Sequence, residues 1–281
     1  MGGKLRSAPR SVLYDLRVSP PVSGQHVRAW RPPIPGVREV FHASTLDHAY
    51  PTHTHDTWTV FIVDRGAIAY HLDRDDHGAV DAMVSVLPPG VPHDGRPATS
   101  DGFSKRVLYV ETSLLGEHLV GHAVDRPEIH DPELHRDVAR LHERLVGDVD
   151  VLEVETLALD VADRIAARLT ARPAMAPPPS SRGAERFRAM LDDDPTQRLT
   201  LTEAAGRIGA NPTHLARSFT RTFGIPPHRY RLGRRIDAAR TQLLDGTPPA
   251  VVAARLGFAD QAHLTRRFRQ LVGTTPARFA Q

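Results

Sequence analysis

Two stretches in the C-terminal third of the chain repeat each other. The segment AAGRIGANPTHLARSFTRTFGIPPHRY (204–230) is echoed by VAARLGFADQAHLTRRFRQLVGTTPARF (252–279). Small, apolar and turn residues align throughout, including Gly209 with Gly257, Leu215 with Leu264, Phe219 with Phe268 and Pro227 with Pro276. The offset is 48 residues before the turn and 49 after it. An internal repeat with one inserted residue predicts two copies of one supersecondary unit.

Each copy has the pattern of a helix, a tight turn and a second helix. In the first copy, Thr202 with Glu203 is a helix-start signal, and Gly209 is expected to end that helix. Asn211 then caps the second helix, with Pro212 at its first position. Its apolar stripe has a spacing of four residues: Leu215, Phe219 and Phe223.

This pattern is the helix-turn-helix arrangement, in which the second helix lies in the major groove of DNA. Glycine-turn hairpins also occur in plain helical bundles. Two copies joined by a predicted connecting helix (227–246) favour DNA binding instead. Gln can read adenine and Arg can read guanine through paired hydrogen bonds. The side chains predicted to face DNA are those outside the apolar stripes: Thr213, Ala216, Arg217, Thr220, Gln261, Ala262, Thr265, Arg266 and Arg269.

The charge of the chain is divided unevenly between its two parts. Residues 181–281 contain 17 Arg, no Lys and 8 acidic residues, a net charge of +9, whereas residues 1–180 carry −6. A solvated Arg-rich helical surface could produce this imbalance. A nucleic-acid-binding module joined to an acidic module would produce it as well, and the double helix-turn-helix favours that interpretation.

The C-terminal region resembles the DNA-binding domain of the AraC family of transcription regulators. RRIDAARTQLLDG, VAARLGF and GTTPARF match, in order, the family's linker helix, the entry to its second motif and its closing signature. The resemblance implies a DNA-binding regulator with a small-molecule effector, double-stranded DNA as partner and a homodimeric state. It also implies contact with RNA polymerase if the protein is an activator.

The N-terminal region has the pattern of a β-rich domain. Short β-prone runs occur between residues 37 and 111, separated by the turn signals DRG, DRDDHG and PPGVPHDGRP. The expected class is α+β, with a cupin-like barrel followed by helices and then an all-α domain with two helix-turn-helix motifs. The predicted segments are an N-terminal arm (1–36), a sensing barrel (37–130), a helical segment (131–171), a Pro-rich linker (172–183) and the DNA-binding domain (184–281).

The stretch PTHTHDTWTV (51–60) contains the candidate sensing site. If His53 and His55 lie on one strand, their side chains share a face, because alternate residues of a strand point the same way. His53-x-His55, Gly66 and PPGVPH (88–93) resemble the cupin barrel, and in particular the sensor half of AraC-type regulators. The favoured interpretation is a small-molecule pocket lined by His53, His55, Trp58, Tyr70 and His93.

Two alternatives remain at this site. His53, His55 and His93 could hold a zinc or iron ion, or they could be hydrogen-bonded residues that only define the fold. Cupin enzymes add a carboxylate shortly after the second His, where this chain has Thr59. We therefore expect no catalytic residues and no resident cofactor, and keep a metal-dependent cupin enzyme fused to a DNA-binding module as the alternative function.

Two helical patterns follow the barrel. Residues 131–148 carry apolar side chains at helical spacing, and residues 150–172 do the same. Such stripes usually pack onto their own domain. The family resemblance implies that one of the two helices also forms a dimer seam.

Composition excludes several other classes of protein. The chain has 281 residues and no cysteine, so disulfides, thiolate metal sites and cysteine nucleophiles are excluded. The N-terminal stretch lacks the apolar core of a signal peptide, and no apolar run approaches the length of a membrane helix. A cytoplasmic protein without membrane contact is expected. The sequence leaves open the effector, the operator and the sign of regulation.

Overall fold

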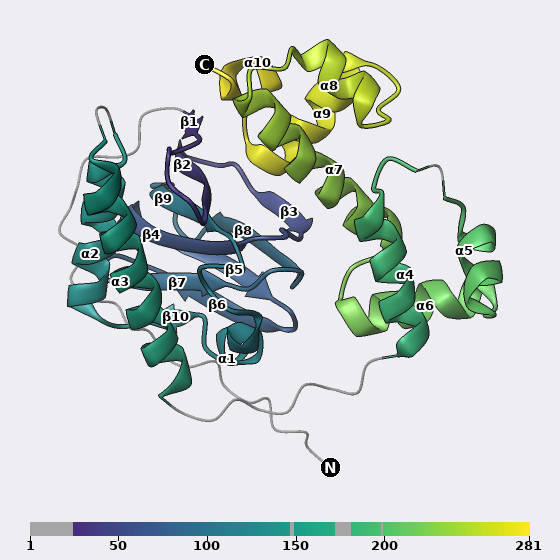
Figure 1. Ribbon diagram of the computed structural model, residues 1–281, viewed down its shortest axis with the longest axis horizontal. Helices are drawn as coiled ribbons and strands as arrows, with labels where there is room; N and C mark the ends of the chain where they lie inside the picture. The colour runs from purple at the N-terminus through teal and green to yellow at the C-terminus, as the bar shows by residue number, and fades with distance from the viewer. Residues whose placement is uncertain (1–24, 147–148, 172–180, 198) are drawn as a thin grey trace.

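Ten strands form two antiparallel sheets in the N-terminal half of the computed structural model, which describes residues 25–146, 149–171, 181–197 and 199–281 (Figure 1). The six-stranded sheet has the order β1 (His26–Trp30), β2 (Val37–Thr45), β9 (Phe103–Val110), β4 (Trp58–Gly66), β7 (Val84–Leu87) and β10 (Glu128–Ile129). The four-stranded sheet has the order β3 (Tyr50–His53), β8 (His93–Pro97), β5 (Ile68–Leu72) and β6 (Asp75–Ala79).

The large sheet separates two apolar cores, and β4 shows why. Its side chains alternate between the two faces, as a strand requires. Trp58 and Ile62 lie in the core beneath the helices that cover the outer face. Phe61 and Val63 lie in the core between the two sheets. This strand is buried on both faces, which explains its continuous apolar run.

Helices cover the outer face of the six-stranded sheet. They are the 3-10 helix η1 (Glu117–Leu119), α1 (Val120–Asp125), α2 (Pro132–Arg144) and α3 (Val151–Thr170). The side chain of Asp131 caps α2 by accepting from the backbone N–H groups of Glu133 and Leu134, at 3.0 and 3.1 Å. Both helices predicted after the barrel are present, and both bury their apolar stripes against the sheet.

The C-terminal helices form two units. The first contains α4 (Arg182–Asp193), α5 (Leu201–Ile208) and α6 (Pro212–Phe223), and the second contains α8 (Pro249–Arg255), α9 (Gln261–Val272) and α10 (Pro276–Phe279). Gly209 ends α5 with a left-handed φ of 78°, and Asn211 caps α6, as predicted. The cap of α5 is Thr200 in a capping box with Glu203, not Thr202, so that prediction was two residues late.

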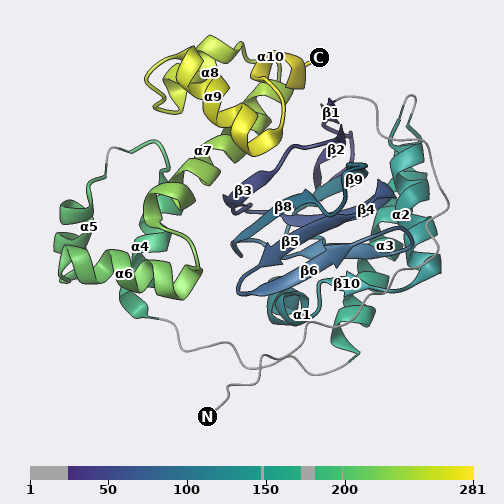
Figure 2. The same ribbon diagram turned by 180° about the vertical axis from the view of Figure 1, so that it is seen from behind.

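Helix α7 (Pro227–Leu244) connects the two units (Figures 1 and 2). Its first half places Tyr230 in the core of the first unit. Its second half places Ile236 and Leu243 in a core that is continuous with the core between the two sheets. The second helical unit and the β-rich domain therefore share one apolar interior, whereas the first unit has its own.

The predicted α+β class, with a β-rich domain followed by two helix-turn-helix units, is confirmed. Some elements were not predicted. β1 lies within the expected arm, β6 begins inside the expected turn DRDDHG and extends one residue beyond it, and β8 lies within PPGVPHDGRP. The linker predicted at 172–183 lies mostly outside the described residues, and α4 begins at Arg182. Within the described ranges, no helix combines the length and the apolarity needed to cross a membrane.

Candidate ligand pocket and nucleic-acid interface

Three buried imidazoles meet at one end of the β-rich domain. His53 ends β3, His93 begins the neighbouring strand β8, and the two residues are paired across the sheet. His55 lies in the link between β3 and β4. The Nε2 atoms of His53 and His55 are 3.2 Å apart, and one ring nitrogen from each of the three lies within 4.8 Å of the others.

The three His residues were predicted to lie together, but the predicted reason was wrong. His53 and His55 do not share a face of one strand. β3 belongs to the four-stranded sheet and β4 to the six-stranded sheet, so the chain changes sheets between them. This crossing turns the His55 ring back toward His53 and His93.

The second nitrogen of each ring has a partner of its own. His53 Nδ1 donates to the carbonyl oxygen of Pro51 at 2.7 Å, and His93 Nδ1 donates to that of Val91 at 3.1 Å. His55 Nδ1 lies 2.8 Å from Oδ1 of Asp237, which is on α7. A carbonyl or carboxylate oxygen only accepts, so each Nδ1 carries a proton, and in a neutral ring the Nε2 presents its lone pair to the others.

Burial keeps two of these rings neutral. Burial and the neighbouring imidazoles of His93 and His55 hold the pKa of His53 well below its usual range. Burial, together with His55, lowers the pKa of His93 to about 3. Near pH 7 both rings are therefore unprotonated at Nε2, which is the form that binds a metal ion or accepts a hydrogen bond from a ligand.

A small pocket of about 40 Å³ lies beside the three rings, inside the core between the sheets. His53, His55, Tyr70 and His93 line it, as predicted. Thr59 also lines it, and its buried Oγ1 has no hydrogen-bond partner among the described residues. Trp58 does not line it, contrary to the prediction, because the next residue along a strand points to the opposite face.

Lys105 of β9 supplies a cation to this pocket. Its Nζ lies 4.3 Å from the centre of the Tyr50 ring and 5.7 Å from that of Phe61. The described residues place no carboxylate at salt-bridge distance from it. Burial and the positive charge of Arg240 lower the pKa of Lys105 to about 7. The ammonium group would therefore be stabilised by an anion entering the pocket.

The helical half of the molecule completes the pocket wall. Arg240 of α7 and Leu271 and Val272 at the end of α9 are among the lining residues. Next to them, the side chain of Gln25 donates a hydrogen bond to the carbonyl oxygen of Gly273. The end of α9, the second helix of the second helix-turn-helix unit (the reading helix of that unit, as α6 is of the first), therefore closes a pocket that belongs to the β-rich domain.

Ion pairs hold α7 against the β-rich domain. Arg240 makes a two-point contact with Glu39 at 2.6 and 3.2 Å, and both side chains are at most 6% exposed. Burial is the largest effect and opposes the charge of Arg240, but Glu39, Tyr109 and Asp237 together outweigh it and raise the pKa of the guanidinium. Arg234 pairs with Asp56 at 3.1 Å. Asp237 lies beside His55. The β-rich domain is therefore contacted by three α7 residues at a spacing of three: Arg234, Asp237 and Arg240.

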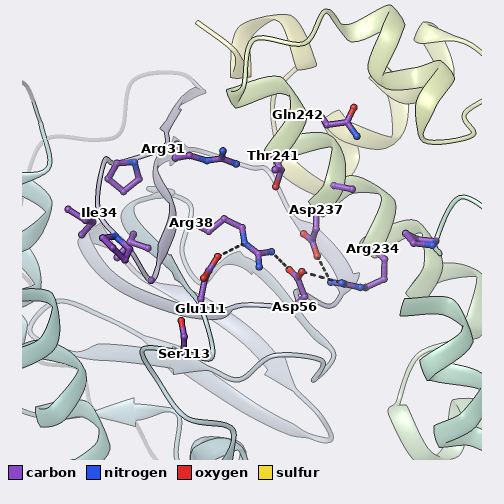
Figure 3. A pocket seen from close by; sticks show the side chains of 16 residues that line it. Arg31, Ile34, Arg38, Asp56, Glu111, Ser113, Arg234, Asp237, Thr241 and Gln242 are labelled. Carbon is purple, nitrogen blue, oxygen red and sulfur yellow. Dashed lines mark hydrogen bonds and ion pairs between the residues drawn. The ribbon is translucent and has the colours of Figure 1, made fainter. Parts of the chain in front are cut away.

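These contacts border a larger cleft of about 700 Å³ between α7 and the β-rich domain (Figure 3). Figure 3 shows a chain of charges along its wall, from Glu111 through Arg38, Asp56 and Arg234 to Asp237. Each of these charged groups already has an ionic partner. The charged groups of the cleft are therefore already paired. In the three-His pocket, by contrast, Lys105 has no ionic partner among the described residues.

The predicted DNA-facing residues lie on the outer faces of α6 and α9. Thr213, Arg217, Gln261, Ala262, Arg266 and Arg269 are exposed, and Ala216, Thr220 and Thr265 are half-buried. The apolar stripes below them are buried, except that Phe223 at the end of α6 is half-buried. The hydroxyl groups of Thr220 and Thr265 donate to backbone carbonyls one turn earlier, at 3.0 and 2.9 Å. The structure places all nine side chains where a ligand outside the protein can reach them.

Two family models match the two halves separately. The AraC-like ligand binding domain matches residues 35–162, and a helix-turn-helix domain matches residues 204–281. The chain belongs to the AraC family of transcription regulators. In this AraC-family protein, the three-His pocket lies within the first match and both reading helices lie within the second.

Curated relatives match parts of the chain. The HTH-type transcriptional regulator RipA of Corynebacterium glutamicum is 32% identical over 125 residues, which are 44% of this chain and 37% of RipA. The bifunctional transcriptional activator/DNA repair enzyme AdaA of Bacillus subtilis is 30% identical over 105 residues, which are 37% of this chain and 49% of AdaA. The AraC-family chain thus spans less than half of the length of each of these relatives.

Solved structures show the same fold over nearly the whole chain. ToxT of Vibrio cholerae superposes with a TM-score of 0.57 at 11% identity, covering 92% of this chain and 98% of ToxT. The unsaturated fatty acid-bound form of ToxT has the same TM-score and identity and covers 94% of this chain. At this identity the likeness concerns the AraC-family architecture, not individual side chains.

Sequence reasoning missed the residues that join the two halves. Asp237 and Arg240 fall within the segment RRIDAARTQLLDG, where they were assigned only to a connecting helix. Their spacing of three was a signal, since Arg234, Asp237 and Arg240 lie on one face of the helix. Lys105 had no signal, because one Lys in a β-prone run usually points to solvent.

Proposed function

We propose that this protein is a DNA-binding transcription regulator whose two reading helices respond to a small molecule in the three-His pocket. One observation carries the proposal: the end of α9 forms part of the pocket wall. A molecule larger than the present space of about 40 Å³ needs part of the pocket wall to move, and Leu271 and Val272 belong to that wall. In the proposed mechanism these two residues move on entry, which changes the position of α9 and, through α7, biases the spacing of the two reading helices.

The DNA contacts are assigned to the exposed faces of α6 and α9. Arg217 and Arg266 are the proposed base-reading residues, because both are exposed in the middle of their helices. Thr213, Gln261 and Ala262 lie at the helix starts, where base contacts are usual. Thr220 and Arg269 lie near the helix ends and are assigned to phosphates.

The proposed effector carries an acidic group. The pocket wall also contains Asp94 and Arg240, which are paired with His71 and Glu39. Lys105 is the remaining charged residue of the described wall and has no ionic partner there, so the site favours a small anion with an apolar body. The fatty acid-bound form of the structural relative ToxT supports this class of effector.

A homodimer is proposed with α3 as its seam. Leu152 and Leu159 lie two turns apart on this helix and are 74% and 55% exposed. Large apolar side chains exposed at this spacing are typical of a helix that packs against a partner. Two copies would place four reading helices on one operator. Contact with RNA polymerase belongs to the proposal only if the protein activates.

The full-length protein tests the proposal directly. Selection of bound sequences from random duplex DNA should yield an operator, and its affinity should fall steeply with salt, since phosphate contacts release counterions. Folded protein that selects no sequence at low salt would refute the assignment. Genomic footprinting then identifies neighbouring genes, whose products indicate the effector and the sign of regulation.

The second candidate function is a metal-dependent enzyme fused to the DNA-binding module. The relative AdaA, which combines a transcriptional activator with a DNA repair enzyme, and the three-His cluster keep this candidate open. Thr59, where cupin enzymes have a carboxylate, argues against it. Turnover of a candidate substrate that depends on a stoichiometric metal ion would favour the enzyme over the sensor.

A further inference from the structure

The close approach of His53 and His55 needs an explanation. Their Nδ1 atoms donate to Pro51 and Asp237, so in the neutral rings both Nε2 atoms are lone-pair acceptors. These two acceptors face each other at 3.2 Å, and both rings are buried. Two acceptors at this distance repel each other unless a cation or a proton lies between them.

The geometry fits a metal ion. Two nitrogens bound to one zinc ion in tetrahedral geometry are about 3.3 Å apart, close to the separation found between His53 and His55. The third ring, His93, needs to approach by no more than about 1.5 Å to complete the set. In the metal sites of proteins, a ligating imidazole donates its other N–H to a carbonyl or carboxylate, as all three rings do here.

A fourth coordination position would face the pocket. Thr59 lines the pocket beside the three rings, and its buried Oγ1 lacks a hydrogen-bond partner among the described residues. A water molecule in that position could accept or donate a hydrogen bond there. Three neutral nitrogen donors with one open position are a ligand set that zinc and related ions accept.

We infer that His53, His55 and His93 bind a divalent first-row transition-metal ion, and that Asp237 is the outer carboxylate of this site. Asp237 belongs to α7, in the helical half of the molecule. A carboxylate that accepts from a ligating imidazole fixes the ring and increases its basicity. The ion therefore binds more tightly when α7 is docked, and docking is more favourable when the ion is bound.

This inference goes beyond the proposed function, because it requires neither an effector nor an operator. Its experiment is titration of the metal-free full-length protein with zinc, followed by calorimetry, and with cobalt(II), followed by its visible spectrum. We expect one ion per chain and a spectrum typical of nitrogen ligation. If neither ion binds stoichiometrically, the metal site is refuted, and a proton on His55 separates the two rings instead.

Two substitutions test the role of Asp237. Asp237→Asn keeps all three imidazoles and should weaken zinc binding about 10- to 100-fold, the usual effect of losing an outer-shell carboxylate. Asp245→Asn is the matched control. It removes the carboxylate directly after α7, which pairs across the two halves with Arg31 but contacts none of the three rings. It should leave zinc affinity within about twofold. Equal affinities for wild type and Asp237→Asn would overturn the link to α7.

Docking supplies a second readout that does not depend on affinity. The chain has no cysteine, so Ser100→Cys and Ala250→Cys introduce two unique dye positions, both exposed, one in each half. Energy transfer between the dyes should shift on adding zinc to the labelled protein, and the shift should be smaller with Asp237→Asn. Zinc that binds without any change in transfer, at zinc concentrations that saturate the site, would contradict the coupling.

Discussion

Gly233 of α7 packs against the backbone of Thr54, the residue between His53 and His55. A Cβ at position 233 would lie 3.3 Å from the Thr54 carbonyl oxygen and 3.7 Å from its nitrogen. Such a distance is tighter than most side-chain contacts, so the absence of a side chain permits this approach of the helix. The helix must come this close for Asp237 to reach His55.

The first prediction concerns Gly233→Ala. Alanine should stabilise α7 as a helix by up to about 1 kcal/mol, but it should push α7 away from Thr54. We expect faster hydrogen exchange in the link between β3 and β4 and a smaller gain in unfolding free energy than helix propensity alone gives. Gly206→Ala is the control, because a Cβ there meets nothing within 4 Å. Identical behaviour of the two variants would contradict close packing at Gly233.

The second prediction concerns the buried pair of Glu39 and Arg240. Glu39→Gln leaves the Arg240 guanidinium buried without its counter-charge, and it should lower the free energy of unfolding by about 3–5 kcal/mol. Asp245→Asn, which breaks an exposed pair with Arg31, should cost no more than about 1 kcal/mol. Equilibrium denaturation of both variants measures the difference. Equal small losses would mean that water reaches Arg240 readily.

The third prediction concerns Lys105 and pH. Because the pKa of Lys105 is lowered to about 7, its charged form dominates below pH 7 and is lost above it. Binding of a linear carboxylate should therefore weaken by up to about tenfold per pH unit above 7. Lys105→Met should abolish binding at every pH, while operator affinity without effector is preserved. Calorimetry with carboxylates of increasing chain length provides the measurement. Carboxylate binding that does not change with pH would show that Lys105 does not contact the carboxylate.

The fourth prediction concerns sequence reading. Arg217→Ala and Arg266→Ala should each lose roughly 1–3 kcal/mol at one or two base positions of the operator, as expected for a base-reading Arg. Binding to a set of operator variants shows whether the loss depends on the base. A uniform loss across all variants would assign both residues to phosphates, and Gln261 and Thr213 would become the candidates for base reading.

The fifth prediction concerns the dimer. Leu152→Glu together with Leu159→Glu places two charges on the exposed apolar face of α3 and should convert a dimer to a monomer. Sedimentation at micromolar concentration measures the change. The circular dichroism spectrum should not change, because neither side chain is in the core. A dimer that persists with both substitutions would show that the dimer interface is not on α3.

Local signals predicted the helical half of the fold well. Gly209, Asn211 and Pro212 act through their own backbone and caps, so their roles can be read without tertiary context. The repeat also predicted the second unit. The β-rich half was harder, since β6 (DDHGA) and β8 (HDGRP) have turn-like composition and are strands because their neighbours pair with them.

The candidate pocket was predicted only in part, for the same reason. His53, His55 and His93 were found from their spacing and from the cupin resemblance. Trp58 was wrongly assigned to the pocket. The face on which it lies depends on where β4 begins, and β4 begins only after the chain has changed sheets. The pocket also uses residues more than 140 positions after His93: Asp237, Arg240, Leu271 and Val272. The spacing of Asp237 and Arg240 indicates one face of a helix, but it does not relate that face to a pocket, because only the docking of the two halves brings these residues there.

In the proposed mechanism, Leu271 and Val272 compete with the effector for the pocket. If an effector binds only the fraction of molecules in which α9 has withdrawn, its apparent dissociation constant is the intrinsic one divided by that fraction. Any DNA site that draws α9 outward increases this fraction. Different operators would then set different sensitivities to the same effector concentration, without any change in a residue that touches the effector.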